Sequence, residues 1–293
     1  MNPAAVANRF SEAARVDINH LGVSGKIRVR GMIANHDRPS LEYAEATQRK
    51  FAQIGIHYEL LQVERLALET AIIEANDDPE IHGIFVYFPV FHSEQDSYLR
   101  NLVDYRKDIE AGSIYWTRKL YNNDRLVDGD PSRKALLPCT PLAIVKLLVE
   151  IGVYAKDNQP LTGRTVTIFN RSEVIGRPLA IMLSNDGAKV YSFDVNGPML
   201  FVDARPEEIN ISRTQALEGS DIVVTGVPSA DFDKITAGEI RPDCVCLNFS
   251  SYSNFDEDIT DRNRIYIPRV GPMTVAMCIR NTLRLYRNFH RDS

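Results

Sequence analysis

The residues with the clearest chemical potential follow Thr165-Val166-Thr167-Ile168-Phe169, a run of β-branched and aromatic residues that predicts a strand. A loop over 170–177 comes next, and Pro178 fits the first turn of a helix after it. The free N–H groups at such a helix end can hold the pyrophosphate of a dinucleotide, and Arg171 and Arg177 add positive charge. We therefore predict a phosphate-binding loop over 170–177.

A carboxylate follows the next predicted strand. The helix ends at Asp186-Gly187, and 189–193 reads as a strand that delivers Asp194. A carboxylate at this place accepts hydrogen bonds from ribose hydroxyls and repels a 2′-phosphate, so Asp194 favours NAD over NADP. The glycine fingerprint is incomplete, since Gly176 lacks the usual earlier pair and Asn170 stands where a glycine is expected. An ordinary βαβ crossover, with Asp194 as a solvated strand end, is therefore an open alternative.

Composition limits the classes of protein to consider. The chain has 293 residues, 44% hydrophobic and 25% charged, which fits a globular protein of two domains. A formal net charge of −5 argues against nucleic-acid binding, and no apolar run is long enough to span a bilayer. The N-terminus lacks a secretory signal, and four cysteines without zinc-like spacing suit a reducing compartment, so we expect a cytoplasmic protein with buried thiols.

Strands and helices alternate along the chain, which predicts an α/β fold with parallel sheets. We expect strands at 26–34, 57–63 and 83–87, with helices at 40–54 and 66–75 between them, and a second set of strands at 165–169, 189–193, 221–225, 244–248 and 266–267. The predicted domains are 1–145, completed by a C-terminal helix over 272–290, and 146–271. Ligands bind beyond the carboxyl ends of parallel strands, so loops at Phe88, Asn170, Gly226 and Ser250 should surround a cleft.

Three segments in register resemble the methylenetetrahydrofolate dehydrogenase family: Leu137-Pro138-Cys139-Thr140-Pro141, 171–178 and 270–277. Lys107-Asp108-Ile109-Glu110 and Tyr87-Phe88-Pro89 also match. The resemblance implies an N-terminal folate-binding domain, a Rossmann-type NAD-binding domain and a homodimer. It further implies oxidation of 5,10-methylenetetrahydrofolate to the methenyl form, in one-carbon metabolism and purine biosynthesis.

The chain departs from the family at one corner. Most members have a lysine four residues after the tyrosine that matches Tyr43, and it serves hydrolysis of the methenyl group; here that position is Thr47. Tyr87 stands where a supporting glutamine is usual, and Lys50 is almost two helical turns from Tyr43. The sequence therefore predicts the monofunctional NAD-dependent branch, without cyclohydrolase activity. Hydride removal needs positioning rather than a general base, whereas hydrolysis needs proton handling.

The resemblance also implies site residues. On the folate side these are Glu110 as the acid that binds the pterin, Tyr43 and Tyr87 along the folate rings, and Cys139 lining the site. For the cofactor, we expect contacts from Arg171, Ser172, Ile175, Gly176, Asp194, Val195, Thr225, Gly226, Asn248, Gly271 and Thr274. The substrate is a tetrahydrofolate, with or without a polyglutamate tail, and no metal site is expected.

Ordinary structural roles are alternatives for several of these residues. Glu110 would otherwise be an exposed loop residue, the tyrosines core residues and Thr274 a helix N-cap. Two other functions stay open for the whole chain. One is a catalytically silent folate or NAD sensor, and the other is a different two-domain NAD-dependent dehydrogenase, for which no poised histidine or lysine is evident.

Overall fold

The computed structural model describes residues 1–35, 37–260 and 265–291, and the chain divides into two compact units. The seven-stranded unit comprises Met1–Val6 and Thr140–Thr274, and the three-stranded unit comprises Ala7–Cys139 and Val275–Ser293. The unit boundaries fall inside three helices, which are α1 (Pro3–Leu21), α6 (Cys139–Glu150) and α9 (Gly271–Leu285). The sequence had placed the division at 145/146 and 271/272.

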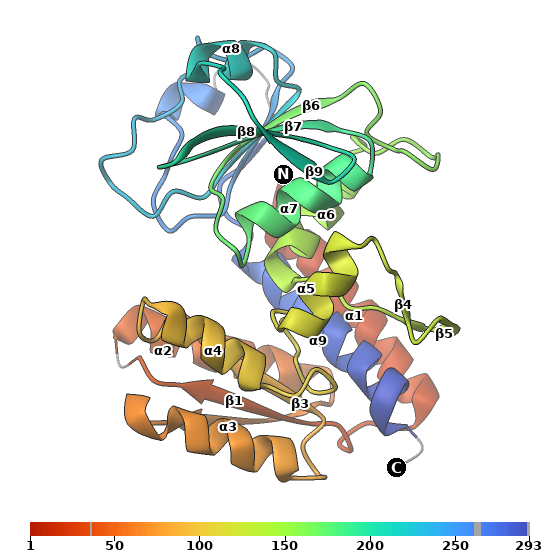
Figure 1. Cartoon of the computed structure of the whole chain (residues 1–293). Coiled ribbons are helices and arrows are strands. Elements are labelled where there is room, and N and C mark those ends of the chain that lie inside the picture. Colours follow the sequence, from red (N-terminus) through yellow and green to blue (C-terminus); the bar gives the residue numbers. More distant parts are fainter. Residues whose placement is uncertain (36, 261–264, 292–293) are drawn as a thin grey trace. The chain divides into compact units, whose positions relative to one another are not determined.

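The three-stranded unit is built on a parallel sheet of order β2-β1-β3. Figure 1 labels two of its strands, β1 and β3. Its strands are β1 (Arg28–Ile33), β2 (His57–Gln62) and β3 (Gly83–Val86). The connections are α2 (Arg38–Gln53) and, after β2, the short η1 (Arg65–Ala67) with α3 (Leu68–Asp77). Parallel strands need such helical crossovers, and the predicted α/β class is confirmed here.

Side chains of β3 alternate between the two faces of this sheet. Ile84 and Val86 lie in a buried cluster with residues of α3 and of α4 (Glu94–Leu102). Phe85 and Tyr87 point to the opposite face, where their ring centroids lie 4.6 Å apart and Tyr87 meets Tyr43 of α2. At its carboxyl end, β3 therefore places side chains on both faces of the sheet.

The remaining elements of this unit follow β3. They are α4, α5 (Ile114–Tyr121) and the antiparallel ribbon of β4 (Leu126–Val127) and β5 (Asp130–Lys134). At the C-terminal side, α9 continues into a wider helical turn, η3 (Tyr286–His290).

The seven-stranded unit has the strand order β12-β11-β10-β6-β7-β8-β9. The first five strands in this order are parallel: β12 (Tyr266–Ile267), β11 (Val245–Asn248), β10 (Ile222–Thr225), β6 (Thr165–Phe169) and β7 (Lys189–Asp194). Between β6 and β7 lies α7 (Gly176–Asn185), and α8 (Arg213–Glu218) and η2 (Glu257–Thr260) occupy later connections. The five parallel strands are those that the sequence predicts.

An antiparallel hairpin extends this sheet beyond β7 and was not predicted. It consists of β8 (Gly197–Val202) and β9 (Arg205–Glu208), joined by a tight turn in which Asp203 and Ala204 both have positive φ. The sheet is therefore mixed rather than wholly parallel. Gly197-Pro198 and Pro206 read as loop residues in the sequence, because proline is tolerated mainly in edge strands.

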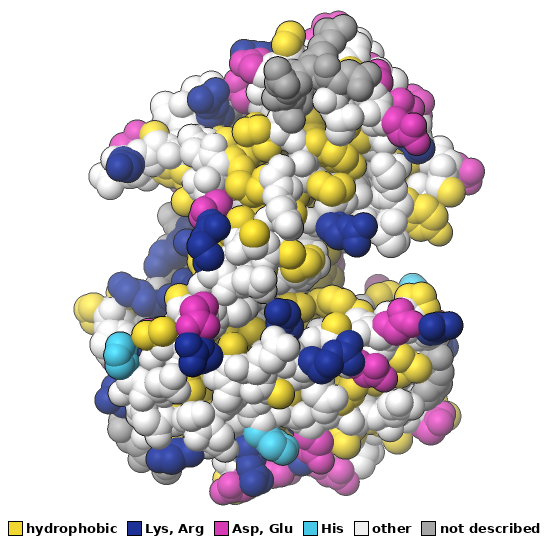
Figure 2. All heavy atoms as spheres, turned by 180° about the vertical axis from the view of Figure 1, so that it is seen from behind, with side chains coloured by type: hydrophobic (Ala, Val, Ile, Leu, Met, Phe, Trp, Pro, Cys, Tyr) yellow, Lys and Arg dark blue, Asp and Glu magenta, His cyan; other side chains and the backbone are white. Residues whose placement is uncertain are grey.

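The burial of the cysteines and the distribution of surface charge match the expectations from the sequence. The four cysteines are free and buried, and Cys244 and Cys246 pack in one apolar cluster, as predicted. On the face in Figure 2, Lys and Arg side chains are interspersed with Asp and Glu side chains. Among the helices of the described residues, none has the length and apolarity needed to cross a membrane.

Candidate active site

The loop between β6 and α7 is held by Asn170, the residue found where a glycine was expected. Its Oδ1 accepts hydrogen bonds from the backbone N–H of Ser172 at 2.9 Å and from the Ser172 hydroxyl at 2.7 Å. Its Nδ2 donates to the carbonyl of Gly226 at 2.9 Å, which joins this loop to the loop after β10. Asn170 therefore fixes the shape of two loops at the carboxyl ends of adjacent parallel strands.

Two glycines in these loops are required by packing. A Cβ on Gly176 would lie 2.1 Å from the carbonyl oxygen of Asn170, and a Cβ on Gly226 would lie 1.9 Å from the ring of Phe249. Gly176 also begins α7, so the strand and the helix N-terminus approach as closely as a dinucleotide-binding turn requires. Ile175 precedes the helix, and its N–H lies 3.3 Å from the Ser172 hydroxyl.

Arg171 has a different position from the one expected. We predicted that it adds charge at the phosphate loop, but its guanidinium is buried and turned towards the end of β7. There it donates to the carbonyls of Ser192 and Gly197, each at 2.9 Å, and forms an ion pair with Asp194. Arg171 therefore positions Asp194, the acid expected to meet the ribose.

Asp194 also accepts a hydrogen bond from the N–H of Asn196 at 2.8 Å, and its side chain is 23% exposed, so part of the carboxylate stays accessible. Val195, between these two residues, is fully exposed. Val195 is therefore accessible to a ligand, and the contact that the sequence predicts stays a prediction.

Thr225 and Asn248 support the loops rather than presenting free side chains. The Thr225 hydroxyl donates to Asn248 Oδ1 at 3.0 Å. Asn248 Nδ2 donates to the carbonyls of Ser250 at 3.1 Å, Tyr252 at 3.0 Å and Pro268 at 3.3 Å. Both side chains are buried, and the expected contact of these residues with the cofactor stays a prediction. They tie together the loops that follow β10, β11 and β12.

Gly271 and Thr274 lie in the first turn of α9. Thr274 is therefore not the helix N-cap, the alternative considered from the sequence, because α9 already begins at Gly271. The Thr274 hydroxyl lies 3.5 Å from the Val270 carbonyl and 3.4 Å from the Thr140 hydroxyl. A Cβ on Gly271 would meet no atom within 4 Å, so packing alone does not require glycine there.

In the three-stranded unit, α2 presents Tyr43 and Thr47 to the end of β3. Asp37 caps this helix by accepting the N–H of Ser40 at 3.0 Å. The buried Thr47 hydroxyl donates to the Tyr43 carbonyl at 2.9 Å, as a threonine facing the preceding turn commonly does. The rings of Tyr43 and Tyr87 meet edge to face with centroids 6.1 Å apart. The predicted neighbours Tyr43, Thr47 and Tyr87 are thus brought together.

Tyr58 of β2 belongs to the same corner and was missed. Its hydroxyl lies 2.8 Å from the Tyr87 hydroxyl, and burial raises the pKa of both phenols. A Cβ on Gly31 of β1 would lie 2.2 Å from the Tyr58 hydroxyl oxygen, so glycine makes room for this ring. A glycine inside a predicted strand was the available signal, because it often marks a close approach.

Glu110 lies in a loop fixed by its neighbours. The backbone of Asp108 forms a β-bridge with Ile84, and its buried carboxylate accepts a hydrogen bond from the Ser113 N–H at 2.8 Å. The Lys107 ammonium donates to three carbonyls at the end of α3 and just after it, those of Ala75, Asn76 and Asp78 at 2.7–3.0 Å. Burial, together with the charge of Asp108, raises the pKa of Glu110 to about 8.

Cys139 lies beneath this loop. Its thiol donates to the Ile109 carbonyl at 3.3 Å, and Asn281 Nδ2 donates to the Ile109 and Leu137 carbonyls at 3.0 and 2.9 Å. Cys139 is only 3% exposed, and burial raises the pKa of its thiol. This corrects the expectation that Cys139 lines the site. It holds the loop that carries Glu110, and Asn281 was a further supporting residue that sequence reasoning missed.

Together these features define a class of protein. The seven-stranded unit has a helix N-terminus, tight glycine turns and a strand-end acid, the parts that hold a dinucleotide. The three-stranded unit offers tyrosine rings and an acid suited to a flat ligand with N–H donors. Within the described residues, no group of three or more His, Cys, Asp and Glu side chains could hold a metal ion. The class is a nucleotide-dependent oxidoreductase of two α/β units.

Comparison with known proteins gives the family. Residues 1–110 match the catalytic domain of tetrahydrofolate dehydrogenase/cyclohydrolase, and residues 138–290 match its NAD(P)-binding domain. The chain is 41% identical to the methylenetetrahydrofolate dehydrogenase [NAD(+)] of Dictyostelium discoideum, over 97% of this chain and 92% of that protein. The chain belongs to the tetrahydrofolate dehydrogenase/cyclohydrolase family, as the sequence predicts.

A solved structure shows the same fold. The NAD-dependent 5,10-methylenetetrahydrofolate dehydrogenase of Saccharomyces cerevisiae superposes with a TM-score of 0.92 at 37% identity, over 98% of this chain and 96% of that one. A bifunctional protein FolD 1 of Rubrobacter xylanophilus is 28% identical over 97% of this chain and 93% of its own length. The chain is thus more similar to the NAD(+)-dependent relatives than to this bifunctional one.

Proposed function

We propose that this protein oxidises 5,10-methylenetetrahydrofolate to 5,10-methenyltetrahydrofolate, with NAD as the hydride acceptor, and does not hydrolyse the product. The observation that carries the proposal is the corner formed by Tyr43, Thr47 and Tyr87 close to Glu110. It has the acid and aromatic rings suited to a folate, but a threonine at the position of the lysine that serves hydrolysis and a phenol at the position of the supporting glutamine. The NAD(+)-dependent relatives in three organisms support the proposal.

The substrate is held from the three-stranded unit. The Glu110 carboxylate accepts two hydrogen bonds from the amino-pyrimidine edge of the pterin, a geometry that a fork of acceptors satisfies. Tyr43, 38% exposed at the corner, packs against the rings. When hydride leaves the methylene carbon, the two flanking nitrogens share the positive charge, so no side chain has to remove a proton. The residues of the site orient the substrate and exclude water.

The seven-stranded unit fits NAD. The start of α7 at Gly176 offers the positive end of the helix dipole to a pyrophosphate, and Asp194 at the end of β7 accepts hydrogen bonds from the ribose hydroxyls. Arg171 is already bonded to Asp194 and to two carbonyls, so its guanidinium is not offered to a 2′-phosphate. NAD supplies the hydride acceptor when it is bound.

Side chains at the tyrosine corner support the proposed lack of hydrolysis. Thr47 has no charge and its hydroxyl is bonded to the backbone, while the Tyr87 hydroxyl is bonded to Tyr58. Burial raises the pKa of Tyr87 above the usual value for tyrosine, so this phenol does not take up or release a proton near neutrality. The corner therefore cannot activate water.

Assembly as a homodimer, a polyglutamylated substrate and a cytoplasmic location remain part of the proposal. They rest on the family and on the sequence. Light scattering of the purified protein, kinetics with mono- and polyglutamylated substrates, and cell fractionation test the three in turn.

A spectrophotometric assay tests the proposed function. Purified protein is mixed with tetrahydrofolate, formaldehyde and NAD, and the methenyl absorbance is followed. We expect NAD-dependent formation of methenyltetrahydrofolate that then decays at the buffer rate. Binding of both ligands without turnover would instead identify a sensor, and enzyme-dependent decay would contradict the monofunctional assignment.

A further inference from the structure

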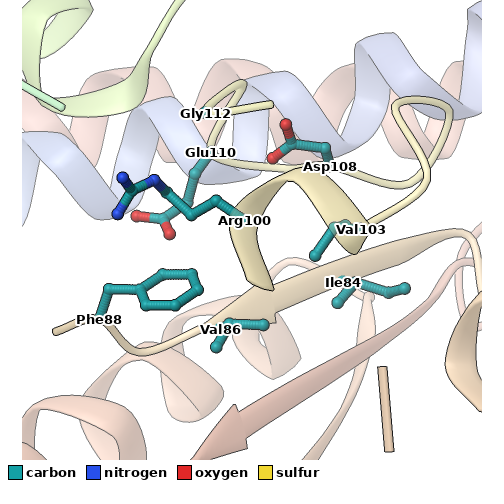
Figure 3. Close-up of a pocket in the computed structure, with 8 residues that line it drawn as sticks. All are labelled: Ile84, Val86, Phe88, Arg100, Val103, Asp108, Glu110 and Gly112. Carbon is teal, nitrogen blue, oxygen red and sulfur yellow. The ribbon is translucent and has the colours of Figure 1, made fainter. Parts of the chain in front are cut away.

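A small pocket lies behind Glu110 in the three-stranded unit (Figure 3). Its walls come from β3, α4 and the Glu110 loop, and they are lined by Ile84, Val86, Phe88, Arg100, Val103, Asp108, Glu110 and Gly112. Three of these residues are ionisable, and the others are apolar residues and one glycine. Two carboxyl groups and one guanidinium thus share a pocket with low-dielectric walls, where charges influence one another strongly.

Arg100 is held at this place by apolar contacts rather than by an ion pair. Its guanidinium carbon lies 5.4 Å from the centre of the Phe88 ring, within the range of a cation–π contact. A Cβ on Gly112 would lie 3.4 Å from Arg100 Cδ, so glycine leaves space for the arginine stem. Among the described residues, no carboxylate lies within ion-pair distance of Arg100, and Figure 3 shows its guanidinium beside the Glu110 carboxylate.

The other ionisable groups around Glu110 oppose its charge or stay neutral. Asp108 on the same loop raises the pKa of Glu110, whereas Arg100 on α4 lowers it. Three further groups lie near enough to be influenced by the charge of Glu110: Tyr43 on α2, Tyr87 just after β3 and Cys139 at the start of α6. All three have a raised pKa, so they are uncharged near neutrality.

Arg100 is therefore the cation that acts on Glu110 in the described part of the chain. A carboxylate that must accept two hydrogen bonds from a pterin has to be ionised, and burial opposes this. The positive charge of Arg100 in this pocket favours the ionised form of Glu110 and so offsets the effect of burial.

We propose that Arg100 is a positioning residue of the folate site: its guanidinium, held on the Phe88 ring, sets the charge and the orientation of the Glu110 carboxylate. This inference rests on the proposed function, in which Glu110 receives the pterin. Arg100 and Glu110 line the same pocket, so the arginine acts through Glu110 and not on the reacting carbon.

The test is the pH dependence of the KM for methylenetetrahydrofolate between pH 6.5 and 9. In the wild type we expect this KM to fall as pH rises and Glu110 ionises. An opposite charge nearby typically lowers a carboxyl pKa by about one to three pH units, so Arg100→Leu should move the profile to higher pH. Its KM at pH 7 should rise about tenfold or more, while the KM for NAD is unchanged.

Three variants complete the design. Arg100→Lys keeps the positive charge and should restore most of the wild-type pH profile of the KM. Glu110→Gln should bind methylenetetrahydrofolate weakly, with a KM that does not depend on pH. Arg49→Leu removes an exposed arginine of α2 and is the matched control. Carboxyl NMR titration of protein labelled with 13C at glutamate reports the ionisation of Glu110 without turnover. Arg100→Leu should shift that titration upward.

The outcomes separate the two claims. If Glu110→Gln binds methylenetetrahydrofolate normally, the proposed role of Glu110 is wrong. If Glu110→Gln is weak but Arg100→Leu leaves both the KM profile and the NMR titration unchanged, the inference about Arg100 alone is overturned. A rise in KM that is equal at every pH in Arg100→Leu would also overturn it, because loss of structure or of a direct contact has no such pH dependence.

Discussion

The two units use their side chains in opposite ways. In the seven-stranded unit, Asn170, Arg171 and Asn248 are bonded to the protein, and Asp194 is a predicted site acid that stays partly exposed. In the three-stranded unit, Glu110 and Arg100 share a pocket without an ion pair between them. Hydrogen bonds within the protein thus hold the loops of the seven-stranded unit, whereas the three-stranded unit has an acid and a cation that are not paired with each other. Substitutions of the bonded side chains should accordingly affect stability, and substitutions of Asp194 or Glu110 should affect ligand binding.

The largest effect should come from Glu110→Ala. Removing an acceptor of two charge-assisted hydrogen bonds costs about 3 kcal/mol or more, so kcat/KM for methylenetetrahydrofolate should fall about a hundredfold or more. The KM for NAD should change little. Steady-state kinetics with each substrate varied in turn measures both, and Glu94→Ala on α4 is the exposed control. A selective loss of NAD affinity would contradict the assignment of Glu110 to folate binding.

Asp194→Ser should change the choice of cofactor. Removing this acid frees the Arg171 guanidinium beside the ribose, where it can pair with a 2′-phosphate. We expect the ratio of kcat/KM for NADP to that for NAD to rise about tenfold to a hundredfold. Asp231→Ser, an exposed loop change, should leave the ratio unaltered. Wild-type preference for NADP, or an unchanged ratio in Asp194→Ser, would refute the account.

Asn248→Ala should mainly lower stability. It removes the side chain that bonds three loop carbonyls and the Thr225 hydroxyl, all in a buried setting. We expect a loss of about 2 kcal/mol in the free energy of unfolding, measured in urea, with smaller changes in folate kinetics. Asn158→Ala on an exposed loop is the matched control. If Asn248→Ala were as stable as the wild type, the hydrogen bonds of Asn248 would not be what stabilises these loops.

The smallest effect should be a gain of hydrolysis. Thr47→Lys alone should give none, because the Tyr87 and Tyr58 rings fill the corner and nothing would orient the ammonium. Thr47→Lys with Tyr87→Gln should accelerate methenyltetrahydrofolate decay by no more than about tenfold over buffer. The decay is followed after NAD is exhausted. Hydrolysis by the single variant would mean that Thr47 alone determines the missing activity.

Much of the fold could be read from local patterns. The run 165–169 and the alternation of strands and helices predict the parallel strands, because buried parallel strands need apolar β-branched residues throughout. The β8–β9 hairpin escaped prediction because its glycine and prolines resemble loop residues, and its turn uses Asp203 and Ala204 at positive φ, which few residues other than glycine adopt. Tertiary pairing overrides such local preferences.

The side-chain directions in the site could not be read in this way. Residue type and spacing identified Arg171 and Thr225 as site residues, but only the folded chain shows that each turns towards the protein. The same holds for Tyr58, which looks like any aromatic residue of a half-buried strand until Gly31, distant in sequence, lies beside it. Pairwise contacts between separate strands are not encoded in either segment alone.

The close approach of Gly31 to Tyr58 has a consequence for substitutions at the two positions. A Cβ at position 31 would lie 2.2 Å from the Tyr58 hydroxyl oxygen, so a larger residue at 31 requires the Tyr58 ring to move. Effects of substitutions at residues in contact are commonly non-additive. We therefore expect a larger residue at position 31 to cost less stability when position 58 holds a smaller side chain.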